Sequence, residues 1–199
     1  MSPELCDEFE GGFGWIEPGF LARTSHALEM DGAVLVFDPV DVPGIDERIR
    51  ALGRPEAVVQ LLDRHQRDCG LVAERLGVPH LRMRLGGSST RSELLNVVWN
   101  RVWKEFAFWE PRRRVLVVGD ALGTVGYFTA PGEAIGVHPF LRLRPPRMLA
   151  ELEPEHILCG HGAGVHGPEA TLALREALAT SRRRLPGALL GGLRRKPKS

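Results

Sequence analysis

Short apolar runs rich in β-branched residues, each ending abruptly in polar residues, constrain the fold of this chain most. Runs at 58–62, 115–118 and 157–159 lead into Asp63 to Asp68, Gly119-Asp120 and Gly160-His161-Gly162, respectively. Continuous apolar runs of this length are typical of buried strands. In α/β proteins the loops that follow the strands form the ligand crevice. We therefore expect the three strand ends, with their Asp and His residues, to meet at one site.

The order of the elements favours an α/β fold. The run 33–37 reads as another buried strand, and Asp31-Gly32 before it is a typical hairpin turn. Apolar residues at helical spacing predict helices over 45–52 and 71–76, each closed by a glycine, and strands alternating with helices indicate layered α/β structure. The stretch 88–103 fits both a helix and a strand, so its structure stays open.

Composition indicates an ordinary globular protein. The 199 residues suffice for one domain, with 43% apolar and 26% charged residues. No apolar run approaches the roughly 20 residues that span a bilayer, so no membrane partner is expected. The acidic start lacks the order of a secretory signal, and three cysteines without C-x-x-C spacing indicate reduced thiols. We therefore expect a cytoplasmic protein.

The end of the chain is strongly basic. Seven Arg and Lys residues, and no acidic ones, lie in the segment 182–199. Such a tail is able to bind nucleic acid. Because prolines and glycines interrupt it, we favour a solvated, flexible tail after a single domain at 1–181, and we consider nucleic acid an improbable partner.

Four motifs in order resemble the metallo-β-lactamase superfamily over roughly residues 24 to 180. They are a strand ending in Asp38, a ligand-loop position at Leu62 to Asp68, the pair Gly119-Asp120 and the triplet Gly160-His161-Gly162. The resemblance implies a four-layer αββα sandwich of two mixed β-sheets flanked by helices, with the site at one edge between the sheets. It also implies that Asp38 is a structural hydrogen-bonding residue under the site.

The ligand motifs depart from the family pattern. The family's Thr-His-x-His-x-Asp-His aligns with Leu62 to Asp68, where only the second histidine is kept, as His65. Asp63 and Asp68 stand in place of histidines, and Arg67 stands in place of the metal-binding aspartate. Asp120 matches the bridging aspartate and His161 the last histidine. His80 comes too early to serve as the remaining family histidine.

The resemblance and the residue types together predict a metal centre of changed composition. Its predicted ligands are Asp63, His65, Asp68, Asp120 and His161. A carboxylate-rich set favours Mn or Fe(II) over Zn. The charge of Arg67 opposes a cation, because unit charges 4 Å apart interact by about 4 kcal/mol at an effective dielectric near 20. We therefore expect that tight two-metal binding is lost and that Arg67 takes over the metal's charge through an ion pair to Asp63, Asp68 or Asp120. Any divalent ion that is bound, whether Zn, Mn or Fe, would be single and weakly held.

Two functions remain open at this point. The first is a hydrolase-like protein acting on a small ester, thioester, lactone or phosphodiester, with Asp120 and Asp68 as catalytic residues. The alternative is a non-catalytic member of the fold that binds a small anionic ligand through Arg64 and Arg67. Structural roles compete with both, since Asp68 suits a helix N-cap and Asp120 and His161 suit turns.

Five aromatic residues that occur close together suit core packing, or a homodimer face if exposed: Trp99, Trp103, Phe106, Phe108 and Trp109.

Overall fold

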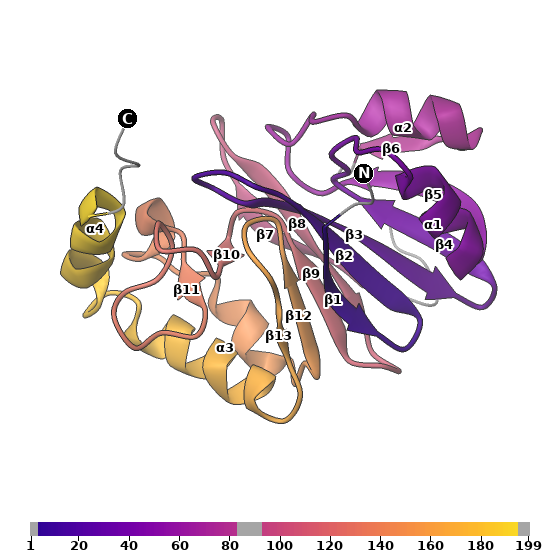
Figure 1. Cartoon of the computed structure of the whole chain (residues 1–199). Coiled ribbons are helices and arrows are strands. Elements are labelled where there is room, and N and C mark those ends of the chain that lie inside the picture. Colours follow the sequence, from indigo (N-terminus) through magenta and orange to yellow (C-terminus); the bar gives the residue numbers. More distant parts are fainter. Residues whose placement is uncertain (1–3, 83–92, 195–199) are drawn as a thin grey trace.

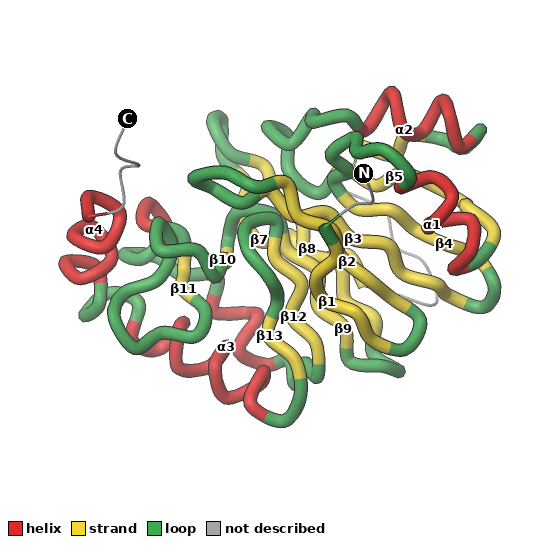
Figure 2. The backbone as a smooth tube through the Cα atoms, viewed as in Figure 1, coloured by secondary structure: helices red, strands yellow, loops and turns green. Residues whose placement is uncertain are grey.

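Two β-sheets pack face to face and carry helices on their outer faces. The computed structural model describes residues 4–82 and 93–194. Helices α1 (Ile45–Leu52) and α2 (Cys69–Leu76) cover one side, and α3 (Glu169–Thr180) covers the other (Figures 1 and 2). Both predicted helices of the first half are present, and each ends at the expected glycine, Gly53 and Gly77.

The first sheet has six strands in chain order. Neighbours among the first four are antiparallel, and the last three are parallel. The predicted hairpin is confirmed, because Asp31 and Gly32 have φ of 55° and 82°, the left-handed pair that a two-residue turn requires. The strands are β1 Leu5–Phe9, β2 Gly12–Glu17, β3 Arg23–Met30, β4 Ala33–Phe37, β5 Arg54–Gln60 and β6 His80–Arg82.

The second sheet has the order β13-β12-β9-β8-β7, and only β9 and β12 are parallel. Its strands are β7 Glu93–Trp99, β8 Lys104–Glu110, β9 Val115–Val118, β12 His156–Cys159 and β13 Val165–His166. The ambiguous stretch therefore contains a strand, while residues 88–92 lie outside the described part. Between β9 and β12 lie the small pair β10 (Leu122–Gly123) and β11 (Gly136–Val137), and the 3-10 helices η1 (Pro139–Leu141) and η2 (Arg147–Glu151).

Three separate apolar clusters hold the layers together. One lies between α1, α2 and the first sheet, with Ile49 and Val72 fully buried. A second lies between the sheets, where the Phe37 and Phe108 rings are 4.9 Å apart. The third packs the second sheet against α3 through Leu116 and other residues. Three interfaces define four layers, so the predicted αββα sandwich is confirmed.

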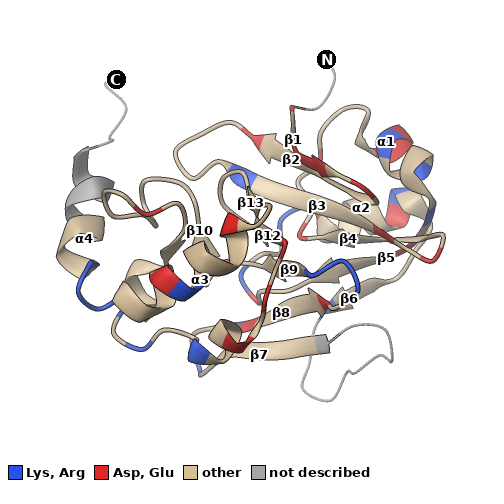
Figure 3. Ribbon diagram, turned by 90° about the horizontal axis from the view of Figure 1, so that it is seen from below, with Lys and Arg blue, Asp and Glu red and all other residues tan. Residues whose placement is uncertain are grey.

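The C-terminal segment contains a helix that the sequence did not predict. Helix α4 spans Leu185–Arg194, so the expectation that prolines and glycines prevent structure there is wrong. Pro186 lies in the first turn, where its missing N–H costs nothing, and Gly187 packs closely on Ala130. The stretch between α3 and α4 carries basic residues (Figure 3). Arg182 there donates to the carbonyl of Leu143. None of the helices in the described residues combines the length and apolar character needed to cross a membrane.

Candidate metal centre

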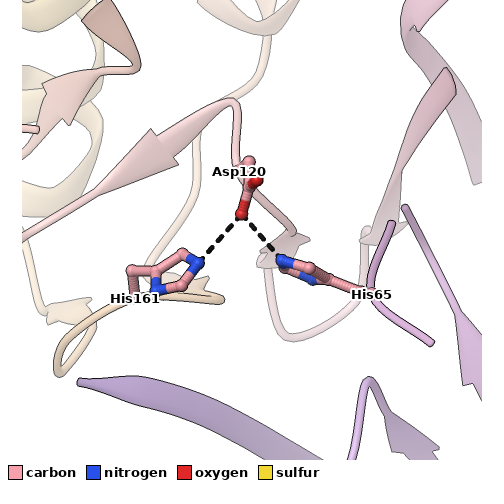
Figure 4. A group of neighbouring side chains, drawn as sticks. All are labelled: His65, Asp120 and His161. Carbon is pink, nitrogen blue, oxygen red and sulfur yellow. Dashed lines mark ion pairs between the residues drawn. The ribbon is translucent and has the colours of Figure 1, made fainter. Parts of the chain in front are cut away.

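The ends of β5, β9 and β12 meet, as the sequence predicted, and bring together His65, Asp120 and His161. Asp120 Oδ1 lies 2.7 Å from His65 Nε2 and 3.0 Å from His161 Nε2 (Figure 4). One ligand atom from each residue lies within 4.8 Å of the other two. Both histidines are buried and Asp120 is nearly so, because the two sheets close over this edge.

The remaining nitrogens of the two rings determine what the group binds. His65 Nδ1 donates to Asp38 Oδ2 at 3.0 Å, and His161 Nδ1 donates to the Leu21 carbonyl at 2.8 Å. Because both partners only accept, each neutral ring presents an Nε2 lone pair to Asp120. Asp120 Oδ1 is buried and receives no well-directed hydrogen bond. Three converging lone pairs repel one another unless a cation or protons lie between them.

The pKa values express the same demand for positive charge. Burial alone would raise the pKa of Asp120, but His161 and His65 lower it far below its ordinary range. For His65, burial and the charge of Arg67 act to lower the pKa, yet Asp120 and Asp38 outweigh them and the net shift is upward. The site therefore stabilises a cation next to a fully ionised carboxylate.

Asp38 fixes the orientation of His65, which confirms the structural role that the resemblance implied. It directly follows β4 with a left-handed φ of 43°. Its Oδ1 accepts from the Leu61 N–H and its Oδ2 from His65 Nδ1, both at 3.0 Å. A carboxylate that orients a histidine in this way is the usual outer partner of a metal-binding imidazole.

Glu105 supports the loop of Asp120, and this role was not predicted from the sequence. Its fully buried carboxyl accepts from the N–H groups of Gly119 and Ala121 through Oε1, and from Trp103 Nε1 through Oε2. Burial and the neighbouring charge of Asp120 raise its pKa to about 7. The only sequence signal is that Glu105 is an acidic residue just before the apolar part of β8.

Asp63 and Asp68 do not join the cluster, so the structure brings together three of the five predicted ligands: His65, Asp120 and His161. The carboxylate of Asp68 accepts from the Asp41 N–H at 2.8 Å, so it ties the loop before α2 to the segment after β4. Asp68 occupies the N-cap position of α2 but does not cap the helix with its side chain. Asp63 is exposed and lines a separate pocket with Gln60, Gln66 and Lys104.

Arg67 forms no ion pair with a carboxylate among the described residues, contrary to the prediction. It donates instead to the carbonyls of Thr24 (2.6 Å), Asp38 (2.9 Å) and Gly160 (2.9 Å). Its φ of 36° lies in a region that non-glycine residues seldom adopt. Burial lowers its pKa, although Asp38 and Asp120 oppose this effect.

An aromatic wall adjoins the metal-binding group. The ring of His138 lies 4.7 Å from Trp103, 5.4 Å from Tyr127 and 5.3 Å from Phe128, measured between centroids. Phe128 in turn stacks on His161 at 5.5 Å. His138 Nδ1 accepts from the Phe140 N–H, and burial lowers its pKa to about 4, so this ring is neutral at pH 7. No sequence motif places His138 near the site.

The residues present fit one divalent ion. Two imidazoles and one carboxylate form the three-ligand set of many catalytic zinc and iron(II) sites, which leave a position open. The buried, unsatisfied Asp120 Oδ1 is the polar atom that such an ion would satisfy. The preference for Mn rested on Asp63 and Asp68, so the three-ligand set removes its basis.

Comparison with known proteins identifies the fold. No family model matches the chain, and no curated protein matches it. Among solved structures, DIM-1 metallo-β-lactamase has a TM-score of 0.62 and 13% identity, covering 94% of this chain and 99% of that one. The metallo-β-lactamase from Pontibacter korlensis has a TM-score of 0.61, 8% identity and coverages of 89% and 99%. TTHA1623 in a di-iron-bound form has a TM-score of 0.54, 20% identity and coverages of 77% and 94%. The chain therefore has the metallo-β-lactamase fold.

Proposed function

We propose that the protein is a metal-dependent hydrolase whose site holds one divalent ion through His65, Asp120 and His161. The observation that carries the proposal is the convergence of two imidazole lone pairs on a buried carboxylate oxygen that has no other partner. A divalent ion at this position would act as a Lewis acid and lower the pKa of a water molecule. The substrate class is a small ester, thioester, lactone or phosphodiester.

The residues of the chain have distinct roles in this proposal. Asp38 and the Leu21 carbonyl hold the two rings so that each Nε2 faces Asp120. Asp120 is the carboxylate available to accept a proton, through the oxygen that does not face the histidines. Asp68 is unsuited to that role, because its carboxylate is bonded to the Asp41 N–H.

Metal analysis of protein purified without chelators tests the site. We expect about one divalent ion per chain, loss of the ion in Asp120→Ala, His65→Ala and His161→Ala, and retention in the matched controls Asp63→Asn and Asp68→Asn. Retention in His161→Ala, or loss in Asp63→Asn, would contradict the three-ligand centre.

Activity distinguishes the hydrolase from a non-catalytic protein of the same fold. The four substrate classes are assayed with as-purified protein, after chelation and after metal is restored. We expect hydrolysis of at least one class that disappears with the metal and is absent in His161→Ala. A stoichiometric ion at these residues without hydrolysis of any class would favour the non-catalytic alternative.

A further inference from the structure

The guanidinium of Arg64 stands beside the candidate metal centre with its donors unused. Arg64 lies in the loop after β5, and its side chain is 48% exposed. Its NH2 atom is 3.8 Å from Asp120 Oδ2, and its Cζ is 4.4 Å from the centroid of the Trp103 ring. Among the described residues, this guanidinium donates no hydrogen bond, so its N–H groups are available to solvent or a ligand.

The platform under Arg64 is rigid. Trp103 is buried, and its Nε1 donates to Glu105 Oε2 at 2.8 Å. The other oxygen of Glu105 holds the N–H groups on both sides of Asp120. One buried carboxyl therefore fixes both the ring on which Arg64 lies and the loop that carries Asp120. Stacking on this ring restricts the long side chain of Arg64 before any ligand binds.

We propose that Arg64 binds a carboxylate or phosphate group of the substrate and places the adjoining bond at the metal centre. The planar fork of a guanidinium matches these oxyanions and binds them with two parallel hydrogen bonds. The inference rests on the proposed hydrolase function for the reacting bond, whereas the anion contact itself needs no metal. The substrate is therefore a small anionic molecule.

Arg67 does not share this role, although the sequence suggested both arginines. Its NH1 and NH2 atoms already donate to three main-chain carbonyls, and its Nε is buried. A ligand would have to displace these bonds to reach it. Arg64 is the arginine of the pair that has free donors at the site.

Binding of inorganic phosphate to chelator-treated protein tests the proposal without the metal. Isothermal titration of wild type, Arg64→Met and Arg64→Lys is compared with Arg54→Met. Arg54 is a matched control, because it too is exposed, at 73%, and lies 3.8 Å from an acidic side chain, that of Glu56. We expect Arg64→Met to weaken binding about tenfold or more, Arg64→Lys to weaken it less, and Arg54→Met to leave it unchanged.

Three results would overturn the proposal: no phosphate binding by wild type at millimolar concentration, unchanged binding by Arg64→Met, or equal losses in Arg64→Met and Arg54→Met. Thermal melts confirm that each variant is folded. Metal content is measured in parallel, and we expect it to be unchanged in Arg64→Met. If wild-type protein binds no metal but still binds phosphate in an Arg64-dependent way, the hydrolase is refuted and the anion site is not.

Discussion

Replacing Glu105 with leucine removes one buried carboxyl that supports two parts of the site. Three donors lose their acceptor: the N–H groups of Gly119 and Ala121 and the indole of Trp103. A hydrogen bond to a charged group contributes about 1.5–3 kcal/mol, so the three together contribute about 4.5–9 kcal/mol. The perturbation therefore has a stability effect large enough to measure.

The cost of burying this carboxylate offsets part of that loss. Its pKa, raised to about 7, shows that burial outweighs these hydrogen bonds for the ionised form, so the sum for a fully charged acceptor overstates the loss. For an acceptor that is partly protonated near pH 7, about 1 kcal/mol for each bond is the better figure. We therefore expect Glu105→Leu to lower the free energy of unfolding by about 3 kcal/mol, which corresponds to a melting temperature lower by roughly 6–12 °C for a chain of this size.

Urea denaturation and thermal melts measure this change, and Glu105→Gln is the matched variant. Glutamine keeps one carbonyl oxygen for Gly119 and Ala121 but presents an amide N–H to Trp103. We expect an intermediate loss of about 1 kcal/mol and altered tryptophan fluorescence. If Glu105→Leu were as stable as wild type, the three hydrogen bonds would not support the loop of Asp120, and the rigidity assigned to the Arg64 platform would fail with them.

Three further predictions concern other parts of the molecule. Asp7 receives hydrogen bonds from His166 Nε2 and the Gly164 N–H, and these and His26 outweigh burial to hold its pKa far below 3.8. An acid with a depressed pKa stabilises the fold above its ordinary pKa, so wild type should lose about 2 kcal/mol of unfolding free energy as the pH falls from 5 towards 2 in urea titrations. The less stable Asp7→Asn variant should show a flatter profile. A Cβ at Gly160 would lie 2.7 Å from the Gly119 carbonyl oxygen and 3.0 Å from His65 Cε1, so Gly160→Ala should lose both stability and metal. In the control variant Gly70→Ala nothing lies within 4 Å of the new Cβ, and thermal melts should show a gain in stability of up to about 1 kcal/mol. Arg67→Met leaves three carbonyls without their donor and should lower the free energy of unfolding by about 2 kcal/mol. If the variant folds, its metal affinity, measured by competition with a chelator, should rise. Unchanged stability would contradict the role of Arg67 in linking these three segments.

The parts of the site that sequence predicted depend on local pattern and sheet geometry. Strands that run parallel end at the same edge, so Asp120 after β9 and His161 after β12 had to be neighbours once the two runs were recognised. His65 followed from its place after β5, and Asp38 from its place after β4. In each case the residue follows an apolar run within a few positions, where the direction of the strand leads the chain to the same edge.

Two predicted ligands, Asp63 and Asp68, lie outside the cluster because side-chain direction is not determined by a motif. Asp63 and Asp68 occupy positions that hold histidines in the family pattern, but a shorter carboxylate finds other partners. Asp68 bonds to the Asp41 N–H, and Asp63 turns to solvent. Glu105 was missed for the opposite reason, because an acidic residue at the start of a strand suggests exposure. Its burial arises from contact with a distant segment, the bridge between Leu62 and Glu105.

Arg67 shows how a guanidinium occupies a position aligned with a metal-binding aspartate without an ion pair. Coulomb attraction predicts a direct contact between Arg67 and a carboxylate. The guanidinium instead bonds to three carbonyl oxygens, one each in β3, in the segment after β4 and in the turn before His161. The bonds to the Asp38 and Gly160 carbonyls link two parts of the main chain. Asp38 orients His65, and Gly160 directly precedes His161. In the proposed centre the positive charge of Arg67 opposes a second ion, and the same side chain ties the segment of Asp38 to the turn before His161.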